Sequence, residues 1–214
     1  RVPSGRPCGG WGQFQMFVSR FVAIFCVQVL ALGCIPLSSR LSGINAQAQS
    51  QLFPDTSVNG ISLRHEESVA RLEKEVNVNF SESDSTGIPV LYLSNSSKEE
   101  YLALYRYHGD LVYQVSMFEV GYCNSLEMRS LQVLRDAHFL SSSGIRLGMH
   151  KDALLKIIGN DFSSIIHNKQ EALKCTINST DSPLLIRYTM PGYFCEYYLR
   201  DGVLYKYRFG FIYP

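Results

Sequence analysis

The sequence lacks the short motifs that mark the common catalytic and nucleotide-binding sites. It contains no Gly-x-Ser-x-Gly nucleophile motif, no phosphate-binding loop and no dinucleotide-binding fingerprint. Two glutamates follow His65, but Val69 stands where a zinc-binding His-Glu-x-x-His motif needs its second histidine. The five histidines show no metal-ligand spacing, and those at helix starts are read as caps. We therefore predict no catalytic residue, no bound metal and no cofactor.

Acidic residues are absent from the first 48 positions, which contain four arginines. The rest of the chain has 16 basic and 19 acidic residues, so the formal net charge of +1 hides a slightly acidic main part. A nucleic-acid-binding protein normally carries a basic excess on one face. None is visible in this composition, and we exclude nucleic acid as a partner. With 46% hydrophobic and 18% charged residues, the chain is expected to be globular.

The N-terminal part has the organisation of a targeting segment. Residues 21–32 form an uncharged apolar run after Arg20, and a polar stretch then ends in Ala-Gln-Ala at 46–48. This order is typical of a signal peptide with a small-x-small cleavage site. We predict that residues 1–48 are a signal peptide, of which residues 1–15 are upstream read-through ahead of a true start at Met16.

Two alternatives for this segment stay open. The apolar run is near the minimum length that spans a bilayer, so it would also suit an uncleaved membrane anchor. The stretch before Cys34 resembles a bacterial lipid-attachment site. The predicted localisation is export to the periplasm or medium of a bacterium, with an outer-membrane lipoprotein as the second reading.

Cysteines are few after the predicted cleavage site: Cys123, Cys175 and Cys195. An odd number leaves at least one thiol without an intramolecular partner. Cys175 with Cys195 is the preferred disulfide because both fall in the second half of the chain. Three unpaired thiols packed as small apolar groups are the alternative.

Two stretches follow one pattern, in which a short extended segment leads into an amphipathic helix. The clearer copy spans residues 144–159, and Gly159 is expected to end its helix. The fainter copy begins at Gly60, and its helix is expected to bury Val69, Leu72 and Val76. The repeated pattern predicts an internal duplication.

The duplication predicts an α+β fold of two similar halves, each with one or two helices packed on an antiparallel β-sheet. The first repeat is placed at 49–123 and the second at 144–214, with a bridging helix or linker at 124–143 that starts with a capping-box pattern. Strands are expected at 90–93, 101–107, 111–120, 172–177, 184–190, 193–200 and 203–213. Two-residue hairpin turns are expected at Gly109-Asp110 and Asp201-Gly202.

The expected turns assign side chains to faces, because side chains alternate along a strand. In the first hairpin, Leu102, Leu104 and Leu111 fall on the core face. The opposite faces of the two hairpins form the predicted protein-binding surface, made of Tyr101, Tyr105, Tyr107, Gln114, Phe118, Tyr193, Tyr197, Lys206 and Arg208. The alternative is that these tyrosines only reflect the preference of tyrosine for β-strands, on a sheet face that is partly exposed to solvent. Glu196 falls on the presumed core face, where a carboxylate needs a partner, and this raises an alternative register for the second hairpin.

The motif GIRLGMH at residues 144–150, continued to Gly159, resembles the opening of the SmpA/OmlA family of outer-membrane-assembly lipoproteins. The resemblance implies two helices packed on an antiparallel sheet. The tandem arrangement resembles the β-lactamase inhibitor proteins, in which two such units form one concave sheet surface. Both implied relationships point to a binder without enzymatic activity. His150 departs from the motif, which has Ser or Thr at this position.

We therefore expect an exported, non-enzymatic protein-binding module, an inhibitor of a secreted or envelope enzyme being one form of it. Its partner would be another exported or envelope protein, and it would contact the membrane only if the signal is uncleaved or Cys34 is lipidated. The first alternative is a membrane-tethered assembly or structural lipoprotein. The second is a secreted hydrolase that uses Cys123 with a distant histidine.

Overall fold

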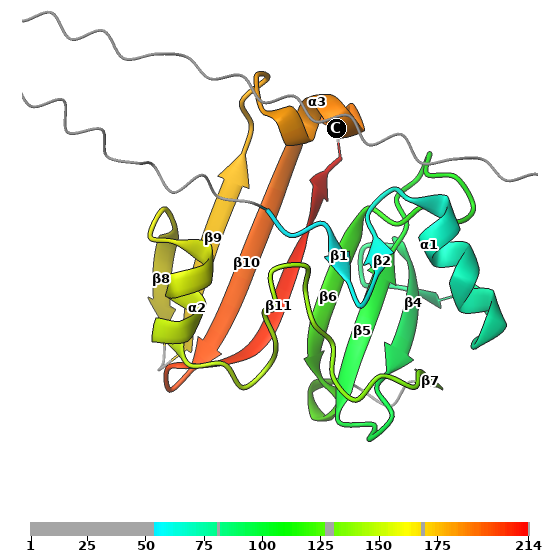
Figure 1. Ribbon diagram of the computed structural model, residues 1–214, viewed down its shortest axis with the longest axis horizontal. Helices are drawn as coiled ribbons and strands as arrows, with labels where there is room; N and C mark the ends of the chain where they lie inside the picture. Colours follow the sequence, from blue (N-terminus) through cyan, green and yellow to red (C-terminus); the bar gives the residue numbers. More distant parts are fainter. Residues whose placement is uncertain (1–53, 81, 127–130, 168–169, 214) are drawn as a thin grey trace, which may run out of the picture. The chain divides into compact units, whose positions relative to one another are not determined.

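The structure is a computed structural model that describes residues 54–80, 82–126, 131–167 and 170–213, all within the compact unit Gln47–Pro214. Within these residues, nine strands form one sheet in the order β3-β4-β5-β6-β11-β10-β9-β8, with β7 beside β4 at the same edge as β3 (Figure 1). The β4–β7 pairing is parallel and the other pairings are antiparallel. The predicted signal peptide, with its start and lipid-attachment positions, lies outside the described residues.

The strands are longest at the centre and toward the C-terminus. Their bounds are β3 Glu82–Ser83, β4 Pro89–Ser94, β5 Glu100–Tyr105, β6 Met117–Tyr122, β7 Gln132–Val133, β8 Ser163–His167, β9 Gln170–Ile177, β10 Gly192–Arg200 and β11 Val203–Ile212. A separate hairpin pairs β1 Ser57–Val58 with β2 Ile61–Ser62. The helical elements are α1 Glu66–Ala70, η1 Arg71–Lys74, η2 Cys123–Ser125, α2 Lys151–Ile158 and α3 Pro183–Tyr188, where η denotes a 3₁₀ turn.

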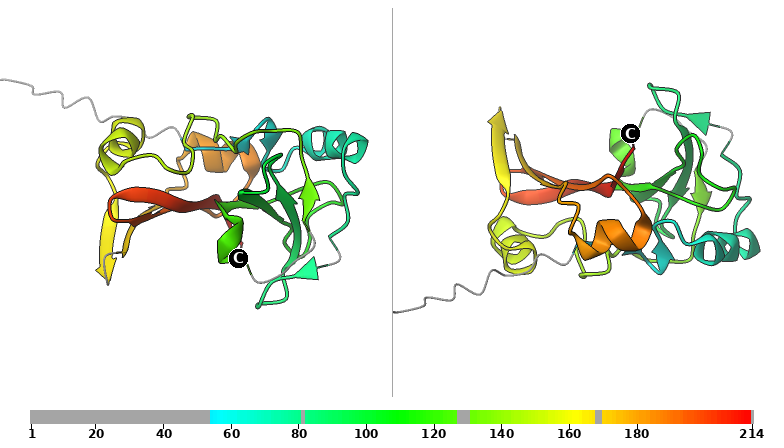
Figure 2. Two further views of the ribbon diagram at one scale, coloured as in Figure 1. Left: turned by 90° about the horizontal axis from the view of Figure 1, so that it is seen from below. Right: turned by 90° about the horizontal axis from the view of Figure 1, so that it is seen from above.

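All three α-helices and the β1–β2 hairpin cover the same face of the sheet (Figure 2). Helix α2 buries Leu154 and Ile158, which are four positions apart, and ends where Gly159 adopts a φ of 77°. Helix α3 begins with Pro183, whose fixed φ suits the first helical position. The opposite face of β9, β10 and β11 has no helix over it in the described residues.

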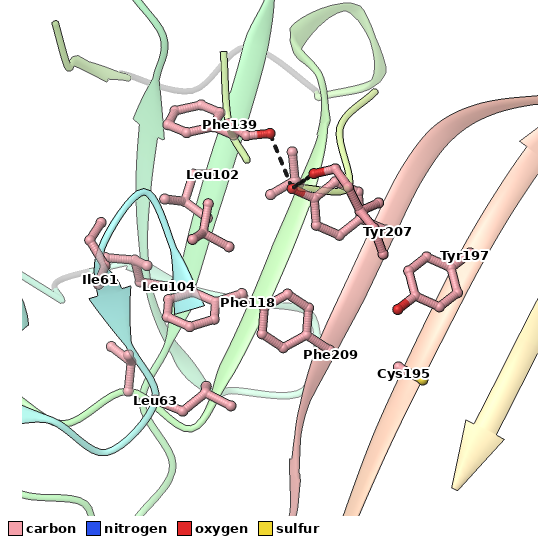
Figure 3. Close-up of a cluster of buried hydrophobic side chains, with 14 of the residues drawn as sticks. Ile61, Leu63, Leu102, Leu104, Phe118, Phe139, Cys195, Tyr197, Tyr207 and Phe209 are labelled. Atoms are coloured by element: carbon pink, nitrogen blue, oxygen red, sulfur yellow. Dashed lines mark hydrogen bonds between the residues drawn. The ribbon is translucent and has the colours of Figure 1, made fainter. Parts of the chain in front are cut away.

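The main core lies between this helix-covered face and the elements packed on it. Leu102 and Leu104 on β5, Phe118 on β6 and Phe209 on β11 meet Ile61 and Leu63 of the β1–β2 region (Figure 3). The Tyr207 hydroxyl donates to the backbone carbonyls of Phe139 (3.2 Å) and Ile145 (3.4 Å), so the buried ring also fixes the loop that crosses the core. A buried tyrosine needs such a partner for its hydroxyl. The main core thus joins the sheet to the β1–β2 region and to the loop that contains Phe139 and Ile145.

A smaller second core lies on the opposite face of β4, β5 and β6. Tyr92, Tyr101, Ala103, Tyr105 and Met117 are buried there. Leu126, just after η2, and Leu131, just before β7, pack against this cluster. Strands β4, β5 and β6 therefore bury side chains on both faces, whereas, within the described residues, β9, β10 and β11 are covered by helices on one face only.

The predicted fold of two similar halves is wrong. The described chain is mostly antiparallel sheet with three short helices and 17% helix, and the proposed repeats at 49–123 and 144–214 share one sheet through the pairing of β6 with β11. The edge of a hairpin presents unpaired backbone N–H and C=O groups, and pairing two such edges satisfies them. The helical patterns at the start of each stretch indicated a duplication that the sheet does not follow.

Several predictions for single helices, turns and buried residues are confirmed, although the predicted overall fold is wrong. The helix expected within the stretch 144–159 is confirmed as α2, which begins at Lys151 and ends before Gly159. The turn at Asp201-Gly202 is also confirmed: both turn residues have positive φ, 50° and 75°, and Arg200 pairs with Val203. Val69, Leu72 and Val76 are buried as expected, although α1 is only five residues long. The strand expected at 184–190 is helix α3, because a short apolar run does not distinguish the two states. In the described part of 124–143 there is a 3₁₀ turn and the strand β7 instead of a bridging helix.

We expect Gly210→Ala to destabilise the protein by about 2 kcal/mol or more, because β6 and β11 would have to separate. A Cβ at Gly210 would lie 2.4 Å from the Ser116 carbonyl oxygen and 2.6 Å from the Met117 Cα. The free energy of unfolding, measured by urea denaturation, checks this. Gly60→Ala is the control: Gly60 has a φ of 78° but open space around it, so its loss should be about 1 kcal/mol. Equal losses would contradict the close β6–β11 contact.

Candidate functional site

The nine residues predicted to form one binding surface do not share a face. Tyr193, Tyr197 and Phe118 point to the helix-covered side and belong to the main core. Tyr101 and Tyr105 point to the opposite side, but both are buried in the second core. Of the remaining four, Tyr107 and Gln114 lie in the connection between β5 and β6, and Lys206 and Arg208 are partly exposed on β11.

The first error comes from the connection after β5. The expected two-residue turn at Gly109-Asp110 is instead a loop from residue 106 to 116, and its centre is the fully buried carboxylate of Asp110. This carboxylate accepts hydrogen bonds from Arg64 Nη1, the Tyr107 backbone N–H and Ser116 Oγ, each at 2.8 Å. The longer loop places Phe118 opposite Leu104. An odd shift in register moves every side chain of β6 to the other face.

The second error comes from a β-bulge between β10 and β11. Tyr198 pairs with Lys206 and Leu199 pairs with Leu204, so Tyr205 is an extra residue on β11. Beyond the bulge, Tyr197 pairs with Tyr207 on the core side. The pair of Glu196 with Arg208 and the pair of Tyr198 with Lys206 then lie on the uncovered side.

The corrected register assembles a partly exposed surface on β6, β9, β10 and β11. We call it the cationic face and define it by Glu119, Lys174, Phe194, Glu196, Tyr198, Lys206 and Arg208. A row of alternating charge crosses four strands within it, because Arg208 lies directly between Glu119 and Glu196, and Lys174 lies beyond Glu196. Opposite charges on facing strand positions stabilise an antiparallel pair.

The cations of the cationic face lie nearer to solvent than its carboxylates. The side chains of Lys174, Lys206 and Arg208 are 37%, 29% and 35% exposed, whereas those of Glu119 and Glu196 are 12% exposed. Glu196 accepts from Arg208 Nε at 2.5 Å and from the Tyr198 hydroxyl, and its second oxygen lies 3.1 Å from Lys174 Nζ. A partner approaching this surface therefore meets positive charge first.

Burial disfavours the ionised form of Glu196, but its hydrogen bonds outweigh this effect. Those from Arg208, Tyr198 and Lys174 together lower the pKa of Glu196 to about 2. Burial and the hydrogen bond to Glu196 raise the pKa of Tyr198, which stays a neutral donor. The carboxylate is thus ionised at any ordinary pH and holds the cations above it in place.

Two aromatic rings on β10 flank the charged row. Lys206 Nζ lies 4.7 Å from the centroid of the Tyr198 ring, and the Arg208 guanidinium lies 5.9 Å from that of Phe194. A cation over a ring face is attracted by the ring quadrupole. On β6, Glu119 accepts from the Tyr101 hydroxyl at 2.7 Å, because Gly121 leaves room for the Tyr101 ring. The cationic side chains therefore have few accessible rotamers.

No group of three metal-ligating side chains occurs in the described part of the chain. His65 and His150 occupy the N-cap positions of α1 and α2, as expected, but neither caps through its side chain. A surface groove of about 500 Å³ lies beside His138, whose Nδ1 is 2.8 Å from Glu100. None of these arrangements brings a nucleophile to a base.

The comparisons with known proteins give no relative: no protein-family model, curated protein or solved structure matches this chain. The SmpA/OmlA resemblance therefore stays a prediction that rests on the motif at 144–159. Among the described residues, no helix is both long and apolar enough to cross a membrane.

Sequence reasoning found two members of the cationic face, Lys206 and Arg208, and missed the other five. The available signal was Glu196, whose charge did not fit the core face of the expected hairpin. Moving Glu196 to the opposite face also moves Phe194 and Tyr198 there, and it moves Tyr197 from the predicted binding surface into the core. That single inference was available from the sequence.

Two adjacent tyrosines test the face assignment. We expect Tyr197→Ala to lower the free energy of unfolding by about 3 to 5 kcal/mol, because the Tyr197 side chain is only 3% exposed in the main core. Tyr198→Ala removes a partly exposed ring on the other face and should cost about 1 to 2 kcal/mol. Urea denaturation of both variants measures the difference. A larger loss of stability for Tyr198→Ala would mean that Tyr198, and not Tyr197, points into the core.

The low pKa of Glu196 makes part of the stability depend on pH. An unfolded glutamate titrates near pH 4.3, so the stabilisation is complete above about pH 5 and is lost as pH falls toward the folded value of about 2. We expect Glu196→Gln to lower the free energy of unfolding by about 1 to 2 kcal/mol at pH 7, since solvent screens part of the interaction. The difference from wild type should shrink in denaturation curves taken between pH 5 and pH 2.5. The exposed Glu75 supplies the control, Glu75→Gln, which should change little at any pH. A difference that is constant with pH would exclude the proposed network.

Proposed function

We propose that this protein is an exported, non-enzymatic protein-binding module whose cationic face docks an acidic surface of another exported or envelope protein. The observation that carries the proposal is the layering of charge, with Lys174, Lys206 and Arg208 toward solvent and two carboxylates beneath them. Inhibition of a secreted or envelope enzyme is one form that such binding would take.

The composition of the face suits protein recognition. Arginine and tyrosine are enriched among the residues that dominate binding energy at protein interfaces. Here Arg208, Tyr198 and Phe194 lie together on the two central strands of the uncovered side. Small substrates, by contrast, bind in concave sites that enclose them, and the cationic face is an open sheet surface.

Preorganisation also supports binding by this face. Lys206 is held between Glu119, at 3.6 Å, and the Tyr198 ring, and Arg208 is held by Glu196. Side chains that are already ordered lose less conformational entropy when a partner binds. Positive charge at the surface additionally attracts an acidic partner from a distance, and salt weakens this attraction.

The proposal is tested by capture of partners from an envelope extract on the immobilised full chain. We expect a protein retained by the wild type to bind at least about tenfold more weakly to Lys174→Ala/Lys206→Ala, because the positive surface is lost. Retention should also fall as salt is raised. The readout is the amount of each captured protein, quantified by mass spectrometry at several salt concentrations.

The matched control is Lys151→Ala/Lys156→Ala on α2, over the helix-covered face. Like the test variant it removes two positive charges. It breaks one ion pair, that of Lys151 with Glu171 at 2.8 Å, whereas the test variant breaks two. Retention should be unchanged in this variant. If both double variants lose the same partner equally, or neither does, the cationic face is not the docking surface.

A further inference from the structure

Cys175 and Cys195 are direct partners in the antiparallel pairing of β9 with β10. Residues facing each other in such a pair have Cα atoms about 4.5 or 5.5 Å apart, which lies within the range that a disulfide spans. Both side chains point to the helix-covered face, where Leu173 and Tyr197 form the next pair on that side. The two sulfur atoms can be joined without a change in register.

We propose that Cys175 and Cys195 are a redox-active dithiol that closes to a cross-strand disulfide in exchange with a small-molecule disulfide such as oxidised glutathione. All three cysteines in the described residues are free thiols in this structure. The proposal goes beyond the binding function and does not depend on it.

The two thiols differ in a way that assigns their roles. Cys195 is 1% exposed, whereas Cys175 is partly exposed. The hydrogen bond between them is the largest influence on both: it lowers the pKa of Cys175 and, together with burial, raises that of Cys195. Because the thiolate is the nucleophile, Cys175 is the thiol that attacks an external disulfide.

The exchange takes two balanced steps. The Cys175 thiolate attacks one sulfur of oxidised glutathione, forming a mixed disulfide and releasing one glutathione thiolate. The Cys195 thiol then gives its proton to water, and its sulfur attacks the Cys175 sulfur, which forms the internal bond and releases the second glutathione as a thiolate. The two released glutathione thiolates take up protons from water. Two protein thiols are oxidised, and one glutathione disulfide is reduced to two thiols. Once Cys175 is in the mixed disulfide it carries no charge, so it no longer opposes ionisation of Cys195.

The bond would act directly beneath the cationic face. Lys174 and Glu196 are the neighbouring pair on the same two strands, and their side chains meet on the uncovered side at 3.1 Å. Joining β9 to β10 also closes a loop that contains α3, which restricts the unfolded chain. Cys123 packs against the second core and is not part of this pair.

The test uses the full chain, equilibrated either in reduced glutathione or in a mixture with the oxidised form. Free thiols are alkylated and the protein is digested with trypsin, which places Cys175 in peptide 175–187 and Cys195 in peptide 188–200. We expect these two peptides to be joined in the oxidised sample. The thermal midpoint should be about 5 to 10 °C higher than in the reduced sample.

Cys123→Ser and Cys175→Ser form a matched pair, since both thiols are partly exposed. The first variant should keep the joined peptides and the shift in midpoint, and the second should lose both. The proposal is overturned if Cys175 and Cys195 are recovered in separate peptides, if Cys175 keeps a glutathione adduct, or if the joined form shows no shift. Should Cys175→Ser not fold, peptide mapping of the wild type and of Cys123→Ser decides.

Discussion

The pairing of β6 with β11 is the contact on which the rest of the structure depends. On the helix-covered side it places the ring centroids of Phe118 and Phe209 5.5 Å apart, within the main core. On the other side the same register sets Glu119 opposite Arg208. Gly210 allows the two backbones to approach because it has no Cβ. One row of backbone hydrogen bonds therefore positions both the apolar interior and the charged surface.

The cationic face is built from residues that alternate with core residues along the same strands. The core holds β10 and β11 through the buried side chains of Tyr197, Tyr207 and Phe209 on the helix-covered face. The neighbouring positions point to the other face and carry Glu196, Tyr198 and Arg208. A change in the core is thus transmitted to the orientation of the charged groups. The two carboxylates are acceptable at low exposure because each forms an ion pair with at least one cation and accepts a hydrogen bond. Packing of the core residues therefore sets the positions of the charged side chains on the cationic face.

The sequence predicts those parts of the fold that local chemistry determines. Helix α2 follows from its apolar spacing and from Gly159, and the Asp201-Gly202 turn follows from the positive φ that both residues accept. The candidate site could not be predicted in the same way, because its face assignment depends on one extra residue at Tyr205 and on the loop held by Asp110. The Asp110 contact with Arg64 joins distant parts of the chain and has no local signature. The apparent duplication was misleading for a related reason, since helix patterns do not specify how strand edges pair.

The long-range pairing of β6 with β11 also bears on how fast the protein folds. Residues near Val120 must find residues near Tyr207 before the centre of the sheet can form, and the Tyr193 hydroxyl must reach the Asp55 carbonyl near the start of the described chain. Proteins dominated by such non-local contacts fold in milliseconds to seconds or more slowly, because the loops must close before the contacts stabilise them. A chain emerging from the ribosome can therefore complete the centre of this sheet only after β11, the last of the described strands, has been synthesised.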